Sequence, residues 1–189
     1  MLLVKPYDRD RAVEYARRWA LSRNPLFVDF TGQGGNCTNF VSQSILAGSC
    51  VMNYTPTFGW YYVSSTDRSP SWTGVEFFYD FMINNEGVGP FMREIRRREV
   101  IPGDVIQLAN DEEDFYHTLM VTAVEGQTIY VSAHSDDALD RRLSTYNYAF
   151  LRYLRVEGVR VEHTDDTCFE PLIEGEALPV PPPMPRETM

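Results

Sequence analysis

Residues 34–43 read GGNCTNFVSQ and predict a helix that begins at a cysteine. Asn36 is a favourable N-cap, so the helix is expected over residues 37–47 with Gly48 as its C-terminal stop. The apolar stripe that supports this helix consists of Phe40, Val41, Ser44 and Ile45.

Helical spacing also appears on both sides of this segment. Residues 8–21 predict a helix capped by Asp8 or Asp10, and residues 74–84 predict another. Thr73 and Glu76 have the spacing of a capping box at the start of the latter helix.

Beyond residue 100 the apolar period changes to two. Strands are predicted at 105–108, 116–124, 128–134 and 149–156, with a hairpin turn at Gly126. Helices followed by an antiparallel sheet predict an α+β fold.

Composition divides the chain into a folded part and a tail. The 189 residues fit one domain, which we expect over residues 1–161. Residues 162–189 are acidic and rich in proline, so we expect them to be disordered or loosely attached. This tail holds seven acidic residues and one arginine, hence six of the ten excess negative charges.

Several classes of partner do not fit this composition. The folded part has no basic stripe, so we expect no nucleic acid. No apolar run approaches the roughly 18 residues of a membrane span. The first residues do not resemble a signal peptide, so the protein stays inside the cell or an export segment is missing from this chain. Nothing in the sequence indicates an oligomeric state.

The three cysteines give no sign of a disulfide framework. Their number is odd, no C-x-x-C pair is present, and Cys50 and Cys168 are interpreted as bystanders. Cys37 differs because a helix N-terminus favours thiolate over thiol, and its free N–H groups can hold an oxyanion. The alternatives for Cys37 are a small buried core residue or a glycine-rich phosphate loop, and the loop lacks the required spacing.

A nucleophilic thiol needs a base, and His117 and His134 lie on the two strands of the predicted hairpin. A Glu125-Gly126 loop places His117 opposite His134, and a Gly126-Gln127 loop places it opposite Asp136. Both registers keep residues 117, 134 and 136 on one face of the sheet. We therefore expect His134 or Asp136 to orient His117.

Two other interpretations of these histidines stay open. They could be ordinary residues of a sheet surface. Cys37, His117 and His134 could also be three ligands of a catalytic zinc ion. The main hypothesis requires no metal and no cofactor.

These motifs together resemble the putative amidase domain found in Gram-positive bacteria. That domain is similar to the NlpC and CHAP cell-wall hydrolases, which have a papain-like fold. The resemblance covers about residues 7–155. It is carried by residues 34–43 together with Tyr7–Ala20, Gly59–Tyr62, Arg68–Thr73, Gly103–Gln107, His117 and His134–Asp137.

The resemblance implies a papain-like fold with N-terminal helices packed on an antiparallel sheet. It also implies amide hydrolysis through a thioester, on peptidoglycan stem peptides. In that scheme Cys37 attacks, His117 transfers the proton, and His134 or Asp136 orients His117.

Three residues close to Cys37 in the sequence and two tryptophans that could wall a substrate groove are the candidates for oxyanion and substrate binding. They are Gln33, Asn36, Thr38, Trp60 and Trp72, although the two tryptophans also fit a structural cluster. The family usually has aspartate where this chain has Asn36. That exchange keeps an N-cap but could mark a binding module that has lost the chemistry.

Overall fold

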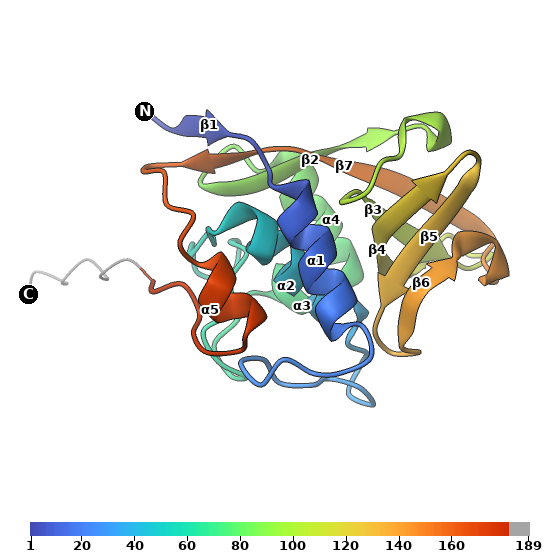
Figure 1. Cartoon of the computed structure of the whole chain (residues 1–189), viewed down its shortest axis with the longest axis horizontal. Helices are drawn as coiled ribbons and strands as arrows, with labels where there is room; N and C mark the ends of the chain where they lie inside the picture. The colour runs from blue at the N-terminus through green and yellow to red at the C-terminus, as the bar shows by residue number, and fades with distance from the viewer. Residues whose placement is uncertain (182–189) are drawn as a thin grey trace, which may run out of the picture.

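The structure is a computed structural model that describes residues 1–181. A layer of helices packs on one face of an antiparallel sheet (Figure 1). The helices are α1 (Arg9–Trp19), α2 (Cys37–Ser49), α3 (Pro70–Thr73), α4 (Val75–Asn84) and α5 (Phe169–Ile173). The strands are β1 (Leu3–Lys5), β2 (Gly89–Ile95), β3 (Val105–Ala109), β4 (Phe115–Glu125), β5 (Thr128–Ala133), β6 (Ala138–Arg142) and β7 (Phe150–Val161). Short 3-10 turns cover Arg97–Glu99 and Leu143–Thr145. The α+β class is confirmed.

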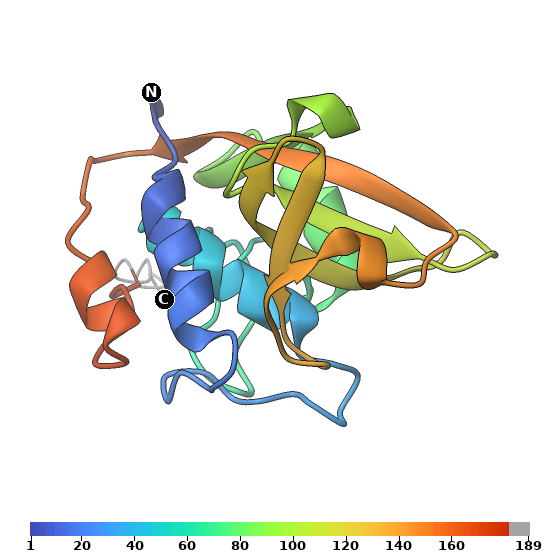
Figure 2. The ribbon, with the colours of Figure 1, turned by 45° about the vertical axis from the view of Figure 1, so that its right-hand side comes forward.

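The long strand β7 organises the seven-stranded sheet. It pairs with β3 over residues 150–154, with β2 over residues 153–160 and with β1 over residues 159–161. The order then continues from β3 through β4 and β5 to β6, with every pair antiparallel. The termini of β4 and β5 lie beside the start of α2 (Figure 2).

Helix α2 lies at the centre of the helical layer, and all of its thirteen residues are buried. It begins at Cys37, as predicted, but runs past Gly48 to Ser49. Gly48 is small for a different reason. A Cβ atom there would lie 2.5 Å from both the Asp8 carbonyl oxygen and the Tyr7 ring. The helix ends instead at Cys50, whose φ of 54° is left-handed.

Each face of the sheet covers a separate hydrophobic core. Val105 and Met120 face the helices and belong to the larger core. Leu119 and Val121 belong to a smaller core on the other face, closed by β6 and the Leu143–Thr145 turn. Because successive residues of a strand point to opposite faces, each position on β4 belongs to one core or the other.

The register of the β4–β5 hairpin corrects one expectation. The loop is Gly126-Gln127, because Glu125 pairs with Thr128. A bulge between Val121 and Ala123 then shifts the pairing by one residue, so Met120 pairs with Ser132. An odd shift moves side chains across the sheet. His117 and His134 therefore do not share a face, contrary to the prediction.

Other local predictions were incomplete. The strands β2 and β6 and the helix α3 were not anticipated. Thr73 ends α3, and the N-cap of α4 is Gly74 without a side-chain hydrogen bond, so the predicted capping box is absent.

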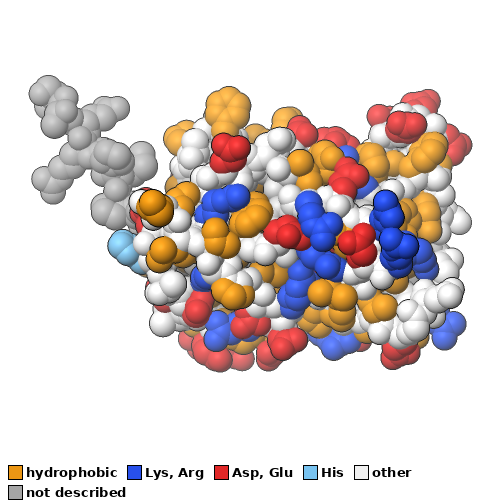
Figure 3. Space-filling view, turned by 90° about the horizontal axis from the view of Figure 1, so that it is seen from above, with side chains coloured by type: hydrophobic (Ala, Val, Ile, Leu, Met, Phe, Trp, Pro, Cys, Tyr) orange, Lys and Arg blue, Asp and Glu red, His pale blue; other side chains and the backbone are white. Residues whose placement is uncertain are grey.

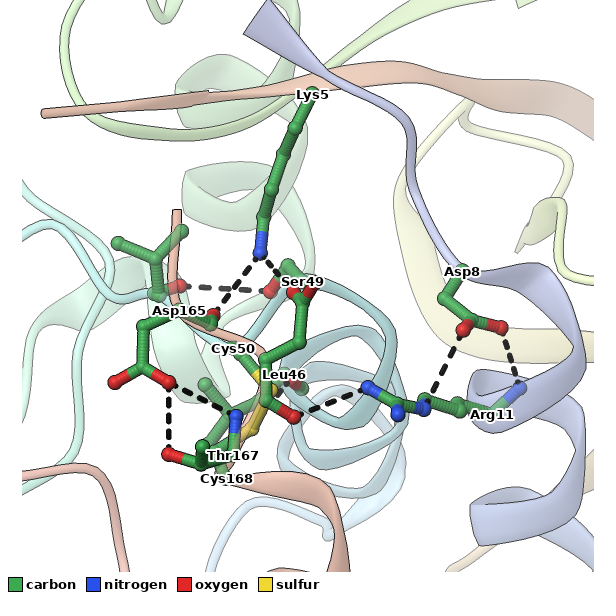
Figure 4. Close-up of a disulfide and its surroundings, with 11 residues drawn as sticks. Lys5, Asp8, Arg11, Leu46, Ser49, Cys50, Asp165, Thr167 and Cys168 are labelled. Atoms are coloured by element: carbon green, nitrogen blue, oxygen red, sulfur yellow. Dashed lines mark hydrogen bonds and ion pairs between the residues drawn. A yellow bond between two sulfur atoms is a disulfide. The ribbon is translucent and has the colours of Figure 1, made fainter. Parts of the chain in front are cut away.

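A disulfide joins Cys50 to Cys168 across 118 residues of sequence (Figure 4). It attaches the segment after β7 to the C-terminal end of α2, so these two cysteines are not bystanders. Two cysteines far apart in sequence carry no local signal of their pairing, which is why the sequence did not indicate it.

Part of the predicted tail is folded. In α5, Phe169, Leu172 and Ile173 are buried in the larger core. The Trp19 indole donates a hydrogen bond to the Ile173 carbonyl, and Lys5 pairs with Asp166 at 2.5 Å. Lys5 also donates to the Asp165 carbonyl (Figure 4). The domain therefore extends beyond residue 161. Residues 182–189 of the predicted tail lie outside the described residues.

The surface mixes both signs of charge. The face in Figure 3 shows arginine and lysine side chains interspersed with acidic ones. On β2, for example, Arg93 pairs with Glu157 and Glu99. Among residues 1–181, no helix is long and apolar enough to cross a membrane.

Candidate functional site

Cys37 is the free cysteine of the chain and the first residue of α2. Its side chain is largely buried, with 7% exposure. Its Sγ atom lies 3.8 Å from Thr38 Oγ1. The predicted position at a helix N-terminus is confirmed, and helix geometry leaves the first N–H groups of α2 without an intrahelical partner.

Asn36 occupies the N-cap position, but its side chain does not cap the helix. Its Oδ1 atom accepts hydrogen bonds from the Phe30 backbone N–H and from Asn39 Nδ2. Its Nδ2 atom lies 2.8 Å from His134 Nδ1. Asn36 is 1% exposed, so this amide is a buried structural group and not an open substrate contact.

His134 does not orient His117. Both of its ring nitrogens have other partners, Asn36 Nδ2 at 2.8 Å and the Trp19 carbonyl oxygen at 2.8 Å. Its ring also stacks on Phe40, with the centroids 4.2 Å apart. This part of the prediction was wrong because the strand bulge turns His134 towards the helices. The same contacts leave no ring nitrogen for a zinc ion shared with Cys37 and His117.

His117 lies near the start of β4 and faces away from α2. Thr118 points to the helices, so its neighbour His117 continues the row of Leu119 and Val121 on the other face. The His117 ring lies between aromatic neighbours, with centroid distances of 6.4 Å to Tyr116 and 5.9 Å to Tyr146.

Burial lowers the pKa of His117 to about 4, with Arg141 acting in the same direction and Asp136 opposing it. The imidazole is therefore neutral at neutral pH. A neutral imidazole is the form that a general base requires.

A side-chain hydrogen bond joins the two elements that carry Cys37 and His117. Thr38 Oγ1 lies 2.8 Å from Thr118 Oγ1, so the residues that follow the candidate nucleophile and base touch each other. In the described residues, no hydrogen bond joins Cys37 to His117 themselves. Cys37 and His117 therefore lie at the same end of the interface between α2 and β4. Their side chains, however, point to different sides of this interface.

Asp136 is the member of the predicted pair that acts on His117. Its carboxylate raises the pKa of His117, and it pairs with Arg141 at 3.3 Å. It is 80% exposed. Ser135 and Asp136 both have positive φ angles, 66° and 137°, in the turn between β5 and β6.

The remaining predicted contacts differ in their outcome. Trp60 and Trp72 are fully buried and donate hydrogen bonds to Ser42 Oγ and Asn39 Oδ1, so they do not wall a groove. Thr38 is fully buried as well. Gln33 lies in an exposed loop, where its side chain makes no hydrogen bond with any described residue.

A cavity of about 430 Å³ opens beside the start of β4. It is lined by Glu76, Glu113, Asp114, Phe115 and Arg152. Arg152 connects this cavity to the β4–α2 interface, because it donates to Gln107 Oε1, and Gln107 donates to Thr118 Oγ1. A larger cavity of about 630 Å³ is lined only by residues between 93 and 99 and includes none of the candidate residues.

Sequence reasoning missed the residues that surround His117 and Asn36. Arg141 and Tyr146 lie in β6 and after it, a strand that was not predicted. Ser135 was missed although it accepts a hydrogen bond from the Asn36 N–H. The described residues contain no group of three or more His, Cys, Asp or Glu side chains that could hold a metal ion.

Comparison with known proteins assigns the family. The family described as "Putative amidase domain" matches residues 6–153. The chain belongs to this family. The description indicates a hydrolase of amide bonds.

The chain is also 33% identical over 136 residues to a protein of Bacillus subtilis (strain 168) described as "Uncharacterized protein YhbB". The match covers 70% of this chain and 42% of the relative, so this member of the putative amidase domain family spans less than half the length of that protein. No solved structure matches.

Proposed function

We propose that this member of the putative amidase domain family is a cysteine-dependent amide hydrolase of papain-like architecture. Cys37 is its nucleophile and His117 its base. The observation that carries the proposal is the position of the free thiol at the first residue of a buried helix, whose next residue touches the neighbour of His117. The family description agrees with amide hydrolysis.

The chemistry follows from these positions. The Cys37 thiol gives its proton to His117, and the sulfur attacks the amide carbonyl carbon. The N–H groups at the start of α2 stabilise the resulting oxyanion. When the tetrahedral intermediate collapses, the C–N bond breaks and His117 protonates the leaving amine. A water molecule activated by neutral His117 then hydrolyses the thioester and restores the thiol.

This scheme requires His117 to come within hydrogen-bond distance of Cys37 in the substrate complex. Because His117 faces away from α2 in this structure, the scheme requires its side chain to turn towards Cys37 when substrate binds. Asp136, which favours the protonated form of His117, stabilises the imidazolium that forms during each transfer.

The proposed substrates are peptides of the peptidoglycan type. The disulfide supports a site of action outside the reducing interior of the cell, because such bonds persist in oxidising compartments. The cavity at Glu76 and Arg152 provides mixed charge beside the site, as a zwitterionic peptide would require.

Thiol labelling and hydrolysis together test the proposal. Under non-reducing conditions, iodoacetamide should modify one thiol per chain, at Cys37. Cys37→Ala should abolish release of free amines from peptidoglycan stem peptides, and His117→Ala should reduce it by about a hundredfold or more. The double variant Cys50→Ser/Cys168→Ser is the matched control and should keep activity where it remains folded.

A binding module on the same fold is the second candidate. It is favoured by the absence of a hydrogen bond between Cys37 and His117 in the described residues. If wild-type protein binds these peptides as tightly as Cys37→Ala and hydrolyses none of them, the binding module is the correct assignment.

A further inference from the structure

The start of α2 is attached to the rest of the fold by a small buried network around Asn36. Asn36, Asn39 and His134 are each 1% exposed. Asn36 also donates its backbone N–H to Ser135 Oγ. The network therefore connects the residue before Cys37 to the turn that carries Asp136.

The donors around Asn36 fix the orientation of its amide. Oδ1 accepts from two groups that can only donate, the Phe30 N–H at 3.0 Å and Asn39 Nδ2 at 2.8 Å. The opposite atom, Nδ2, therefore faces His134 Nδ1 and donates to it. A flipped amide would place two donors against two donors.

The orientation of Asn36 determines the protonation of His134. Nδ1 must be an acceptor, so the proton lies on Nε2 and is donated to the Trp19 carbonyl oxygen at 2.8 Å. Every polar atom of the pair is satisfied only in this neutral tautomer. A second proton on Nδ1 would point directly at the Asn36 amide hydrogens.

We propose that Asn36 and His134 form a neutral lock, which holds the start of α2 and thus Cys37 against the β5–β6 turn, and which opens when His134 is protonated. The role of Cys37 rests on the proposed function. In this assignment His134 is a positioning residue for Cys37 and not the orienter of His117.

The charges around His134 are consistent with a neutral ring. Burial lowers the pKa of His134, and Arg23 acts in the same direction. The hydrogen bond to Trp19 and the carboxylates Asp137 and Asp29 oppose the shift. Both carboxylates are paired with Arg23, at 2.9 Å and 3.0 Å. The lock is therefore closed at neutral pH and opens on the acidic side of the usual histidine range.

The isosteric variant Asn36→Asp provides the sharpest test. A carboxylate at this position accepts a hydrogen bond from protonated Nδ1, so His134 should become an imidazolium and titrate at higher pH than in wild type. Nitrogen-15 NMR of the imidazoles should show protonated Nε2 and unprotonated Nδ1 in wild type, and two protonated nitrogens in Asn36→Asp. His163→Gln, at an exposed position, removes one competing signal.

The rate of Cys37 alkylation reports the position of the thiol. In wild type, the fall of the alkylation rate at acidic pH should coincide with the titration of His134. In Asn36→Asp, this fall should shift to the pH at which His134 then titrates. Asn36→Ala should change the rate at neutral pH by about fivefold or more, since the ring loses its donor. A general structural weakening would not displace the pH profile.

A proton on His134 Nδ1 in wild type at neutral pH would overturn the lock. So would an unchanged His134 titration in Asn36→Asp. Failure of the hydrolase proposal would give a different result. Wild-type protein would then show the predicted imidazole spectrum but would not hydrolyse amides.

Discussion

Thr38 Oγ1 and Thr118 Oγ1 share a buried hydrogen bond of 2.8 Å, the direct polar link between the α2 start and β4. Gln107 donates a second hydrogen bond to Thr118, at 3.2 Å. The contact therefore fixes the relative position of the two elements that carry Cys37 and His117.

Removing this hydrogen bond should lower the stability of the fold, and the effects of substituting its two threonines should not be additive. Thr38→Val and Thr118→Val should each reduce the free energy of unfolding by about 1–3 kcal/mol, since each removes one partner of this buried hydrogen bond. The double variant should cost less than the two single variants together. Urea unfolding of the four proteins gives the coupling energy, and strict additivity would show that the contact is not formed.

Reduction of Cys50–Cys168 should destabilise the domain. The bond closes a loop of 118 residues and holds α5 against α2, so its loss should cost about 2–5 kcal/mol. Thermal unfolding with and without reductant measures this, with Cys37→Ser as the control that should respond as wild type does. An equal melting temperature under both conditions would contradict the pairing.

Acid should weaken the fold through His117. The folded-state pKa is lowered from 6.5 to about 4, so the unfolded chain binds this proton more readily. The stabilisation is complete above about pH 6.5 and is lost as the pH falls towards 4, at about 1.4 kcal/mol per unit. His117→Gln should reduce the slope of the stability profile across this window, and His134, whose pKa burial also lowers, should supply the remaining slope. Identical profiles for wild type and His117→Gln would disprove the shift.

Trp60 should matter for folding and not for substrate binding. It is fully buried and donates to Ser42 Oγ at 3.1 Å, so Trp60→Ala should cost about 3–5 kcal/mol. The milder Trp60→Phe should retain the KM of the folded enzyme. Phe58→Ala, at an exposed aromatic of the same region, is the control and should leave stability unchanged. A large rise in KM with Trp60→Phe would restore the groove interpretation.

The sequence predicted the elements whose periodicity is continuous. The helices at 9–19, 37–49 and 75–84 and the strands β3, β4 and β5 have strong repeats of 3.6 or 2 residues. Tertiary contacts determine what was missed. β2 has no clean alternation because its pairing with β7 shifts between Phe91 and Met92, and α5 is stabilised by a disulfide to a residue 118 positions away.

The candidate site was predictable in its residues more than in its geometry. The residues around Cys37 correctly predicted the helix start. The choice between His134 and Asp136 depended on which residues of β4 and β5 share a face of the sheet. The bulge near Thr122 inserts one residue into β4 and so changes which residues share a face. Hydrophobic alternation cannot locate a bulge when residues on both faces of the strands are buried.

Helix α2 carries the reduced cysteine at its first residue and the oxidised one immediately after its last. Thirteen helical residues at about 1.5 Å each hold the two sulfurs roughly 20 Å apart. The free thiol of Cys37 can therefore coexist with a disulfide on the same segment without attacking it. Scrambled Cys37–Cys50 or Cys37–Cys168 disulfides would form only in molecules in which α2 has unfolded. Detecting such disulfides in a sample would therefore show that part of it has been unfolded.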